Sequence, residues 1–128
     1  MRHTVSHQNL AQFDRQNYLN LESYRKNGQP VRTPLWFAEE RGLIYVYTLA
    51  AAYKVKRIRN NPRVRIVASD ARGNPKGTWV EGRARILDAA GAEHGHQLLR
   101  GKYFLKRFGD LFSRVMNRER VVIAVERV

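Results

Sequence analysis

The stretch from Tyr18 to Thr48 alternates apolar and polar residues around two turn signals, Asn27-Gly28 and the segment Glu39–Gly42. Successive side chains of a β-strand point to opposite faces of its sheet, so this alternation predicts a three-stranded antiparallel meander. In the second strand, one face carries Val31, Thr33, Leu35 and Phe37, and the other carries Arg32, Pro34, Trp36 and Ala38. Pro34 predicts an edge position or a bulge, because proline cannot donate a backbone hydrogen bond.

The rest of the chain predicts two helices and three more strands. A short helix is expected over residues 50–60, where Ala51, Val55 and Ile58 recur at helical spacing. Strands are expected at 63–69, 78–87 and 121–128, with a turn at 70–77. A longer helix is expected over 92–117, interrupted at Gly109-Asp110.

These elements predict an α+β fold in which a mostly antiparallel sheet closes into a six-stranded barrel and so removes its own edges. Gly82 lies inside the strand at 78–87 and predicts a bulge or a close backbone approach. A chain of 128 residues suffices for one hydrophobic core, so a single domain is expected over residues 1–128.

Composition narrows the classes of function. The chain has no cysteine, which excludes disulfides, zinc-thiolate sites, iron–sulfur clusters and a cysteine nucleophile. No stretch approaches the ~20 apolar residues of a membrane span, and the amino-terminal segment is too polar for a signal peptide, so a soluble cytoplasmic protein is expected. The formal net charge of +13 predicts partners rich in phosphate or carboxylate.

The positive charge is concentrated just after the meander. Lys54, Lys56, Arg57 and Arg59 fall within six positions of one another. The strand that ends at Thr48 leads into a helix whose amino end attracts anions, and Lys54 and Arg57 are three residues apart, so that both can reach one ligand. Arg32 could add a charge, and the hydroxyls of Thr33 and Thr48 could donate to phosphate oxygens. The alternative is a solvated basic helix without a ligand.

The sequence offers little catalytic machinery of its own. The four histidines, His3, His7, His94 and His96, have no carboxylate pair at ligand spacing, so they are expected to be solvated and no metal site is predicted. Neither a GxGxxG nor a Walker-type loop is present. Redox chemistry would therefore need a borrowed cofactor. No catalytic residue is assigned, although Tyr45, Tyr47 or solvent could supply a proton.

Three runs carry a resemblance to a known family: residues 28–48 (GQPVRTPLWFAEERGLIYVYT), 54–64 (KVKRIRNNPRV) and 77–87 (GTWVEGRARIL). They resemble the pyridoxamine 5′-phosphate oxidase-like superfamily of flavin- and deazaflavin-binding split β-barrels. Within it, the nearest resemblance is to small F420-dependent oxidoreductases. The similarity extends from Tyr18 to Leu87, and residues 120–128 (RVVIAVERV) resemble the family's last strand.

This resemblance implies a homodimer with two cofactor sites at the subunit interface and a role as a hydride-transferring reductase of electron-poor double bonds. The implied cofactor-binding residues are Arg32, Thr33, Pro34, Trp36, Tyr47, Thr48, Lys54, Val55, Lys56 and Arg57, with Trp79 reaching the groove of the partner subunit. The chain departs from the family at Ala52-Tyr53, where a small hydroxyl or glycine pair is usual. The charge of +13 favours F420, which carries a phosphodiester and glutamate carboxylates, over FMN, which carries one phosphate.

Two alternatives remain open. A nucleic-acid-binding module is suggested by the net charge and by Trp36 and Trp79, which could stack on bases, but the aromatic residues do not form a stacking motif. A non-enzymatic carrier of a flavin, deazaflavin or tetrapyrrole on the same scaffold satisfies every sequence feature, because a fold that binds a cofactor need not turn it over.

Overall fold

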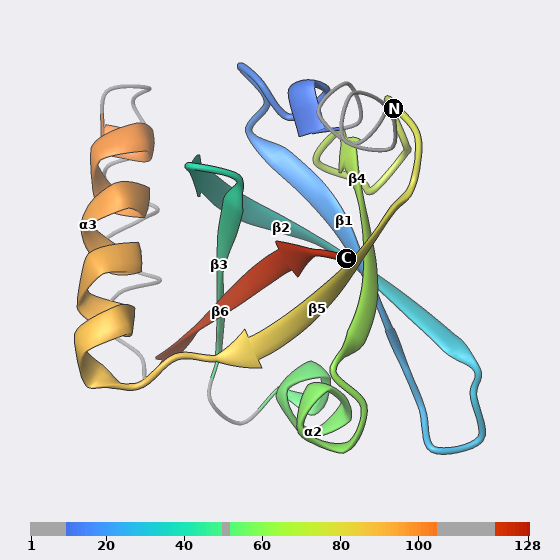
Figure 1. Ribbon diagram of the computed structural model, residues 1–128. Helices are drawn as coiled ribbons and strands as arrows, with labels where there is room; N and C mark the ends of the chain where they lie inside the picture. The colour runs from blue at the N-terminus through green and yellow to red at the C-terminus, as the bar shows by residue number, and fades with distance from the viewer. Residues whose placement is uncertain (1–9, 50–51, 105–119) are drawn as a thin grey trace.

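The computed structural model describes residues 10–49, 52–104 and 120–128. Six strands form a closed barrel in the order β1-β2-β3-β6-β5-β4, and every neighbouring pair is antiparallel (Figure 1). The strands are β1 (Tyr18–Tyr24), β2 (Pro30–Glu40), β3 (Leu43–Leu49), β4 (Arg63–Ser69), β5 (Val80–Ile86) and β6 (Arg120–Arg127). The predicted α+β fold with a six-stranded barrel is confirmed.

The long strand β2 is shared between two neighbours. Its residues 30–36 pair with β1, and its residues 37–40 pair with β3. Pro34 lies in the first part of β2, opposite Asn20 of β1. Among the described residues, this part of β2 has β1 on one side and no strand on the other. The predicted edge position of Pro34 is therefore confirmed, because proline is tolerated where no ladder hydrogen bond is required.

The barrel interior is filled from alternate positions of the strands, as the sequence pattern predicts. Leu35 and Phe37 of β2 point inward, as do Val64, Ile66 and Ala68 of β4. Gly82 of β5 also faces inward, where a Cβ atom would lie 2.8 Å from Val125 Cγ1 and 3.1 Å from the Glu126 carbonyl oxygen. Of the two predictions for Gly82, the close approach is confirmed.

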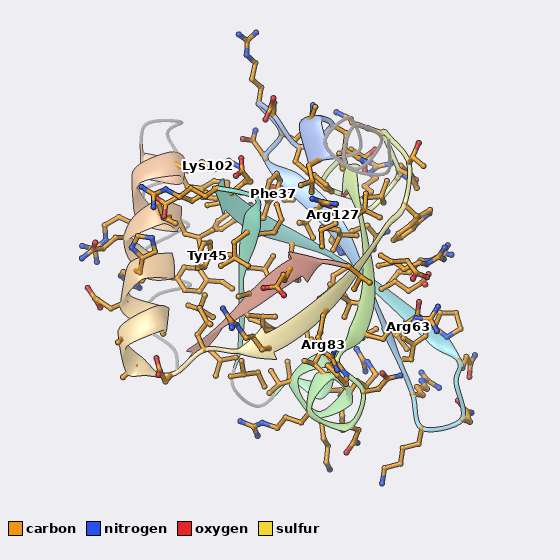
Figure 2. The ribbon with its side chains drawn as sticks, in the orientation of Figure 1. Phe37, Tyr45, Arg63, Arg83, Lys102 and Arg127 are labelled. Carbon is orange, nitrogen blue, oxygen red and sulfur yellow. The ribbon has the colours of Figure 1, made fainter. Side chains whose placement is uncertain are left out.

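Helix α3 (Ala89–Phe104) lies across the outer face of β2, β3 and β6 (Figure 1). A second apolar cluster joins it to the sheet, formed by Ala38, Tyr45, Tyr47, Leu99, Tyr103 and Val122. Figure 2 shows Tyr45 between β3 and the helix, and Lys102 near Phe37. Lys102 lies in the last turn of α3, and its ammonium donates to the Phe37 carbonyl oxygen at 2.8 Å. The expected start at residue 92 is wrong by three residues, and residues 105–119, including the expected break at Gly109-Asp110, lie outside the described residues.

Helix α2 (Tyr53–Asn60) sits at one end of the barrel, between β3 and β4 in the chain (Figure 1). Val55 and Ile58 are buried there, as predicted from their spacing, whereas Ala51 lies outside the described residues. The expected start at residue 50 is not borne out at Ala52, which has extended backbone and serves as the N-cap. Within the described ranges, no helix is long and apolar enough to cross a membrane.

Candidate functional site

A groove of about 440 Å³ runs between α2 and the hairpin that joins β1 to β2. Its lining residues are Tyr24, Arg25, Lys26, Tyr53, Lys56, Arg57 and Asn60. Four of these are cations and none is a carboxylate. We call this the basic groove. Its walls offer hydrogen-bond donors and positive charge together with two aromatic rings, a combination that suits an organic anion.

The cations at this end of the barrel crowd one another. Arg57 donates from Nε to Ser23 Oγ at 2.8 Å, and its pKa is lowered by burial and by the nearby charge of Arg25. Lys54 is half-buried on the same helix, and its pKa is lowered by burial and by Arg57. The described part of the chain gives Lys54 no hydrogen-bond or ion-pair partner. A bound anion would relieve both penalties, because it restores the stabilisation that burial and like charge remove from an ammonium group.

The amino end of α2 adds backbone donors to this charge. Its N-cap is Ala52, which makes no side-chain capping bond, so the first amide groups of the helix lack the usual side-chain acceptor. The Val55 N–H is an exception, since it donates to the Ala52 carbonyl oxygen at 3.1 Å, and the Val55 side chain belongs to the buried face of the helix. Thr48 is buried near the end of β3, opposite Val121.

Arg32 and Trp79 lie on the outer face of the barrel with two residues that the sequence did not single out, Glu22 and Arg65. Glu22 accepts from Arg32 Nε at 2.8 Å, from Arg65 Nε at 2.7 Å and from Tyr24 Oη at 2.7 Å. The guanidinium carbons of Arg32 and Arg65 lie 4.9 and 5.0 Å from the centre of the Trp79 indole ring. We call these four residues the arginine platform. Tyr24 also lines the basic groove, so the two features are adjacent.

Trp36 and Tyr47 are placed elsewhere, beneath α3. Trp36 stacks on Tyr103 with ring centres 5.0 Å apart. The Tyr47 hydroxyl is hydrogen-bonded to His96 Nδ1, and Arg100 donates to His96 Nε2 at 3.1 Å. Because a guanidinium group can only donate, Nε2 is the acceptor in this contact, and the neutral ring then carries its proton on Nδ1 and donates it to the Tyr47 oxygen.

The expectation that the helical histidines are solvated is wrong for His96, whereas His94 is exposed and forms one pair. His96 is half-buried and bonded to β3 through Tyr47. His94 pairs with Glu40 at 2.6 Å and packs edge-on against Tyr45. Neither contact gathers metal ligands, and the described residues contain no group of three or more His, Cys, Asp or Glu side chains that could hold a metal ion.

On one chain, the predicted cofactor residues therefore fall into three places. Lys54, Val55, Lys56 and Arg57 lie on α2, with Thr48 at the end of the strand that precedes it; Arg32 and Trp79 form part of the arginine platform; Trp36 and Tyr47 lie under α3. Thr33 and Pro34 are half-buried on β2 between Arg32 and Trp36.

The residues that the sequence did not single out come from the β1–β2 hairpin. Arg25 and Lys26 directly precede the Asn27-Gly28 turn, and the hairpin register places Glu22 opposite Arg32. Counting outward from the Asn27-Gly28 turn would have found the pairing of Glu22 with Arg32, because the length of a hairpin turn fixes the register of its two strands. The approach of the hairpin to α2 is a tertiary contact without a local signal.

A family model described as pyridoxamine 5′-phosphate oxidase matches residues 6–128 of this sequence. The chain belongs to the pyridoxamine 5′-phosphate oxidase family. The superfamily resemblance of the three runs is thereby confirmed. No curated protein matches the chain.

Solved structures with the same fold are distant in sequence. An F420 reductase is 20% identical, with a TM-score of 0.60, and the match covers 92% of this chain and 91% of that one. A FAD-binding protein from Mesorhizobium loti is 20% identical over 99% of this chain and 88% of its own, with a TM-score of 0.64. The heme storage protein HutZ from Vibrio cholerae is 14% identical over 99% and 88%, with a TM-score of 0.66. At these identities the similarity establishes the fold.

Proposed function

We propose that this protein is an F420-dependent oxidoreductase that holds the anionic part of its cofactor at the basic groove. The observation that carries the proposal is the half-buried side chain of Lys54, which adjoins the groove through Arg57, has no partner among the described residues and has Arg57 as a like-charged neighbour. Burying an ammonium group without a counter-ion is unfavourable, so a site built this way is typical of one completed by an anionic ligand.

The residues fit a phosphate-bearing cofactor. Lys54, Lys56 and Arg57 would hold its phosphate, and the uncapped amino end of α2 would add backbone donors. The exposed ring of Tyr53, where the family usually has a small residue, flanks the groove and would pack against an organic part of the ligand. The other proposed residues lie outside the groove on one chain: Arg32, Thr33, Pro34 and Trp36 belong to β2, Tyr47 and Thr48 to β3, Val55 to the buried face of α2, and Trp79 to the outer face.

The choice of F420 over FMN follows from charge. Four cations without a carboxylate in the groove, and a net charge of +13 for the chain, match a polyanionic cofactor better than a single phosphate. The F420 reductase among the structural neighbours supports this choice. FMN is the second candidate, because the sequence resembles flavin- as well as deazaflavin-binding barrels and one structural neighbour is named as a FAD-binding protein.

F420, when bound and reduced, supplies a hydride to an electron-poor double bond of a small organic acceptor. The contribution of the chain is to bind and orient the cofactor and to surround it with positive charge. A proton must complete the reduction, and Tyr47 is one source within the proposed set. Its oxygen accepts from His96 in the tautomer fixed by Arg100, which leaves the Tyr47 O–H directed to another acceptor.

We propose that the protein is a homodimer whose cofactor sites lie between the subunits. The division of the proposed residues into three places on one chain supports this, because a second copy could bring Trp36 or Trp79 of one subunit to the groove of the other. Light scattering during size-exclusion chromatography should give twice the mass of the 14.9 kDa chain. A mass of one chain at micromolar concentration would refute the dimer.

The function is tested by titrating the purified protein with F420 and, separately, with FMN, and following cofactor fluorescence at low and high salt. Tight, salt-sensitive binding of F420 with weak binding of FMN is the expected result, because screening weakens exposed charge contacts. The reverse preference would make the protein an FMN-dependent member of the family. Binding of heme but neither flavin would indicate a carrier, as the name of the Vibrio cholerae neighbour suggests.

A further inference from the structure

The arginine platform is built around a buried carboxylate. Glu22 is 1% exposed, and both of its oxygens are occupied: Oε2 accepts from Arg32 and Arg65, and Oε1 accepts from Arg65 and Tyr24. A carboxylate with this many charge-assisted bonds is rigid, and so are the groups that bind it. The two guanidinium groups are therefore fixed in position on the outer face of the sheet.

The charges of the platform do not cancel. Two guanidinium groups share one carboxylate, which leaves a net charge of +1. The neighbouring pair of Arg63 and Glu81, with a contact of 2.9 Å, is already neutral and supplies no counter-ion. Within the described residues, no second carboxylate forms an ion pair with Arg32 or Arg65, and Glu81, which stands opposite Arg65 in the β4–β5 register, is paired with Arg63. The platform is therefore an electropositive spot that adds to the positive charge of the adjoining groove.

Unused donors accompany this charge. Arg32 binds Glu22 through Nε, and neither of its Nη groups has a hydrogen-bond partner in the described ranges; its side chain is 52% exposed. Arg65 donates to Glu22 through Nε and Nη2 and also interacts with the Tyr24 hydroxyl, and no described hydrogen bond to another residue is made from its Nη1. The two Nη groups of a guanidinium form a planar fork that matches the two oxygens of a carboxylate or phosphate. Trp79 packs against both guanidinium groups and restricts their movement.

We propose that Arg32 and Arg65 form a paired-guanidinium subsite for an oxyanion, and that buried Glu22 is the residue that positions both. The ligand group is a phosphate or a carboxylate that docks on the free ends of the two guanidinium groups. Tyr24 lines the basic groove and donates to Glu22, so the subsite adjoins the groove. The subsite itself does not depend on the proposed function. Only the further step, which assigns the bound anion to the cofactor or to the acceptor that the cofactor reduces, rests on that function.

The subsite can be tested on the full chain without any cofactor. The protein has two tryptophans, so a ¹H–¹⁵N spectrum contains two indole signals, and the variant Trp36→Phe assigns them. Titration with inorganic phosphate, and separately with acetate, should shift the Trp79 indole signal along a saturating curve while the Trp36 signal stays in place. Tighter binding of phosphate would point to the phosphate of a cofactor, and tighter binding of acetate to a carboxylate. A linear drift of both signals would overturn the subsite.

Matched variants separate this site from general charge. Arg32→Gln and Arg65→Gln should each weaken the binding of the anion about tenfold, which is the effect of losing one charge-assisted contact. Arg85→Gln makes the same charge change on an exposed part of β5 and should stay within about twofold of the wild type. An equal loss in Arg85→Gln would show that only the net charge matters, which would overturn the proposal.

If Glu22 positions the two arginines, its replacement should change anion affinity in the direction opposite to that expected from charge alone. Glu22→Gln and Glu81→Gln both remove one negative charge, so electrostatics alone predicts tighter anion binding in both. Positioning predicts that only Glu22→Gln weakens binding, and tightening in both variants would refute it. If Glu22→Gln does not fold, Arg32→Lys decides the question, because it keeps the charge and loses the planar fork; unchanged affinity would refute the pair. Failure of F420 and FMN to bind would refute the proposed function and leave this test intact.

Discussion

Replacing Glu22 with Gln should change how the stability of the barrel depends on pH. The hydrogen bonds from Arg65, followed by those from Arg32 and Tyr24, outweigh the effect of burial and lower the pKa of Glu22 from 4.5 to about 2. A carboxylate with a lowered pKa in the folded state stabilises the fold above its unfolded value and loses this contribution as pH falls. The contribution is therefore complete at neutral pH and disappears between about pH 4.5 and pH 2.

The size of the effect follows from the shift in pKa. A change from 4.5 to about 2, at 1.36 kcal/mol for each pKa unit, corresponds to about 3 kcal/mol of unfolding free energy. Glu22 is 1% exposed, so solvent screening does not reduce this figure as it would at the surface. A loss of this size is a large fraction of the stability of an ordinary small domain.

The measurement is urea unfolding of the wild type and of Glu22→Gln at several pH values from 7 to 2. The difference in unfolding free energy between the two proteins should shrink by about 3 kcal/mol over the acid range, because only the wild type has this carboxylate to protonate. Glu81→Gln is the control, since its ion pair with Arg63 is exposed and should contribute little at any pH. Parallel curves for the wild type and Glu22→Gln would refute the account of the arginine platform.

Two further substitutions test the packing of α3 against the sheet. In Gly95→Ala, the new Cβ would lie 2.7 Å from Val122 Cγ1 and 2.9 Å from Tyr45 Cδ1, and this overpacking should cost about 1–3 kcal/mol relative to Gly101→Ala, where the Cβ would meet nothing within 4 Å. Gly101→Ala alone should stabilise the protein by up to about 1 kcal/mol, because alanine has a higher helix propensity than glycine. Equal thermal unfolding temperatures for Gly95→Ala and Gly101→Ala would contradict the close approach of α3 to the sheet. In Tyr103→Phe, the Phe37 N–H loses its acceptor at 2.8 Å, which should lower the unfolding free energy by about 1–3 kcal/mol in urea; an unchanged midpoint would contradict this role.

Much of the barrel could be predicted because its strands are half-buried and alternate. The inward positions of β2, β4 and β5 follow from their sequence periods, and Pro34 correctly indicated an edge. The start of α3 was missed although a signal was present: Asp88 Oδ1 accepts from the Gly91 N–H at 3.0 Å, as a helix N-cap does. At α2, Ala52 has good helix propensity but an extended backbone, so reasoning from propensity predicted a helix that starts too early in the chain.

The candidate site was harder to predict, because it depends on contacts between distant segments. The cations of α2 were visible in the sequence, but their neighbours Arg25 and Lys26 come from a hairpin whose direction only the closed barrel sets. Tyr45 and Tyr47 are two residues apart on β3 and so share a face, yet nothing in the sequence said that α3 covers that face. His96 was misjudged for the same reason, since its partner Tyr47 is 49 residues away.

The most direct test of the central claim is the affinity of F420 for the wild type, Lys54→Ala and Arg85→Ala, measured by cofactor fluorescence at one salt concentration. Both variants lose one positive charge, but Lys54 is half-buried on α2 next to Arg57, which lines the groove, whereas Arg85 is exposed on β5. If the cofactor anion completes this site, Lys54→Ala should weaken F420 binding at least about tenfold, while Arg85→Ala stays close to the wild type. Equal affinities for all three proteins would contradict the assignment of the cofactor anion to Lys54 and the groove that adjoins it.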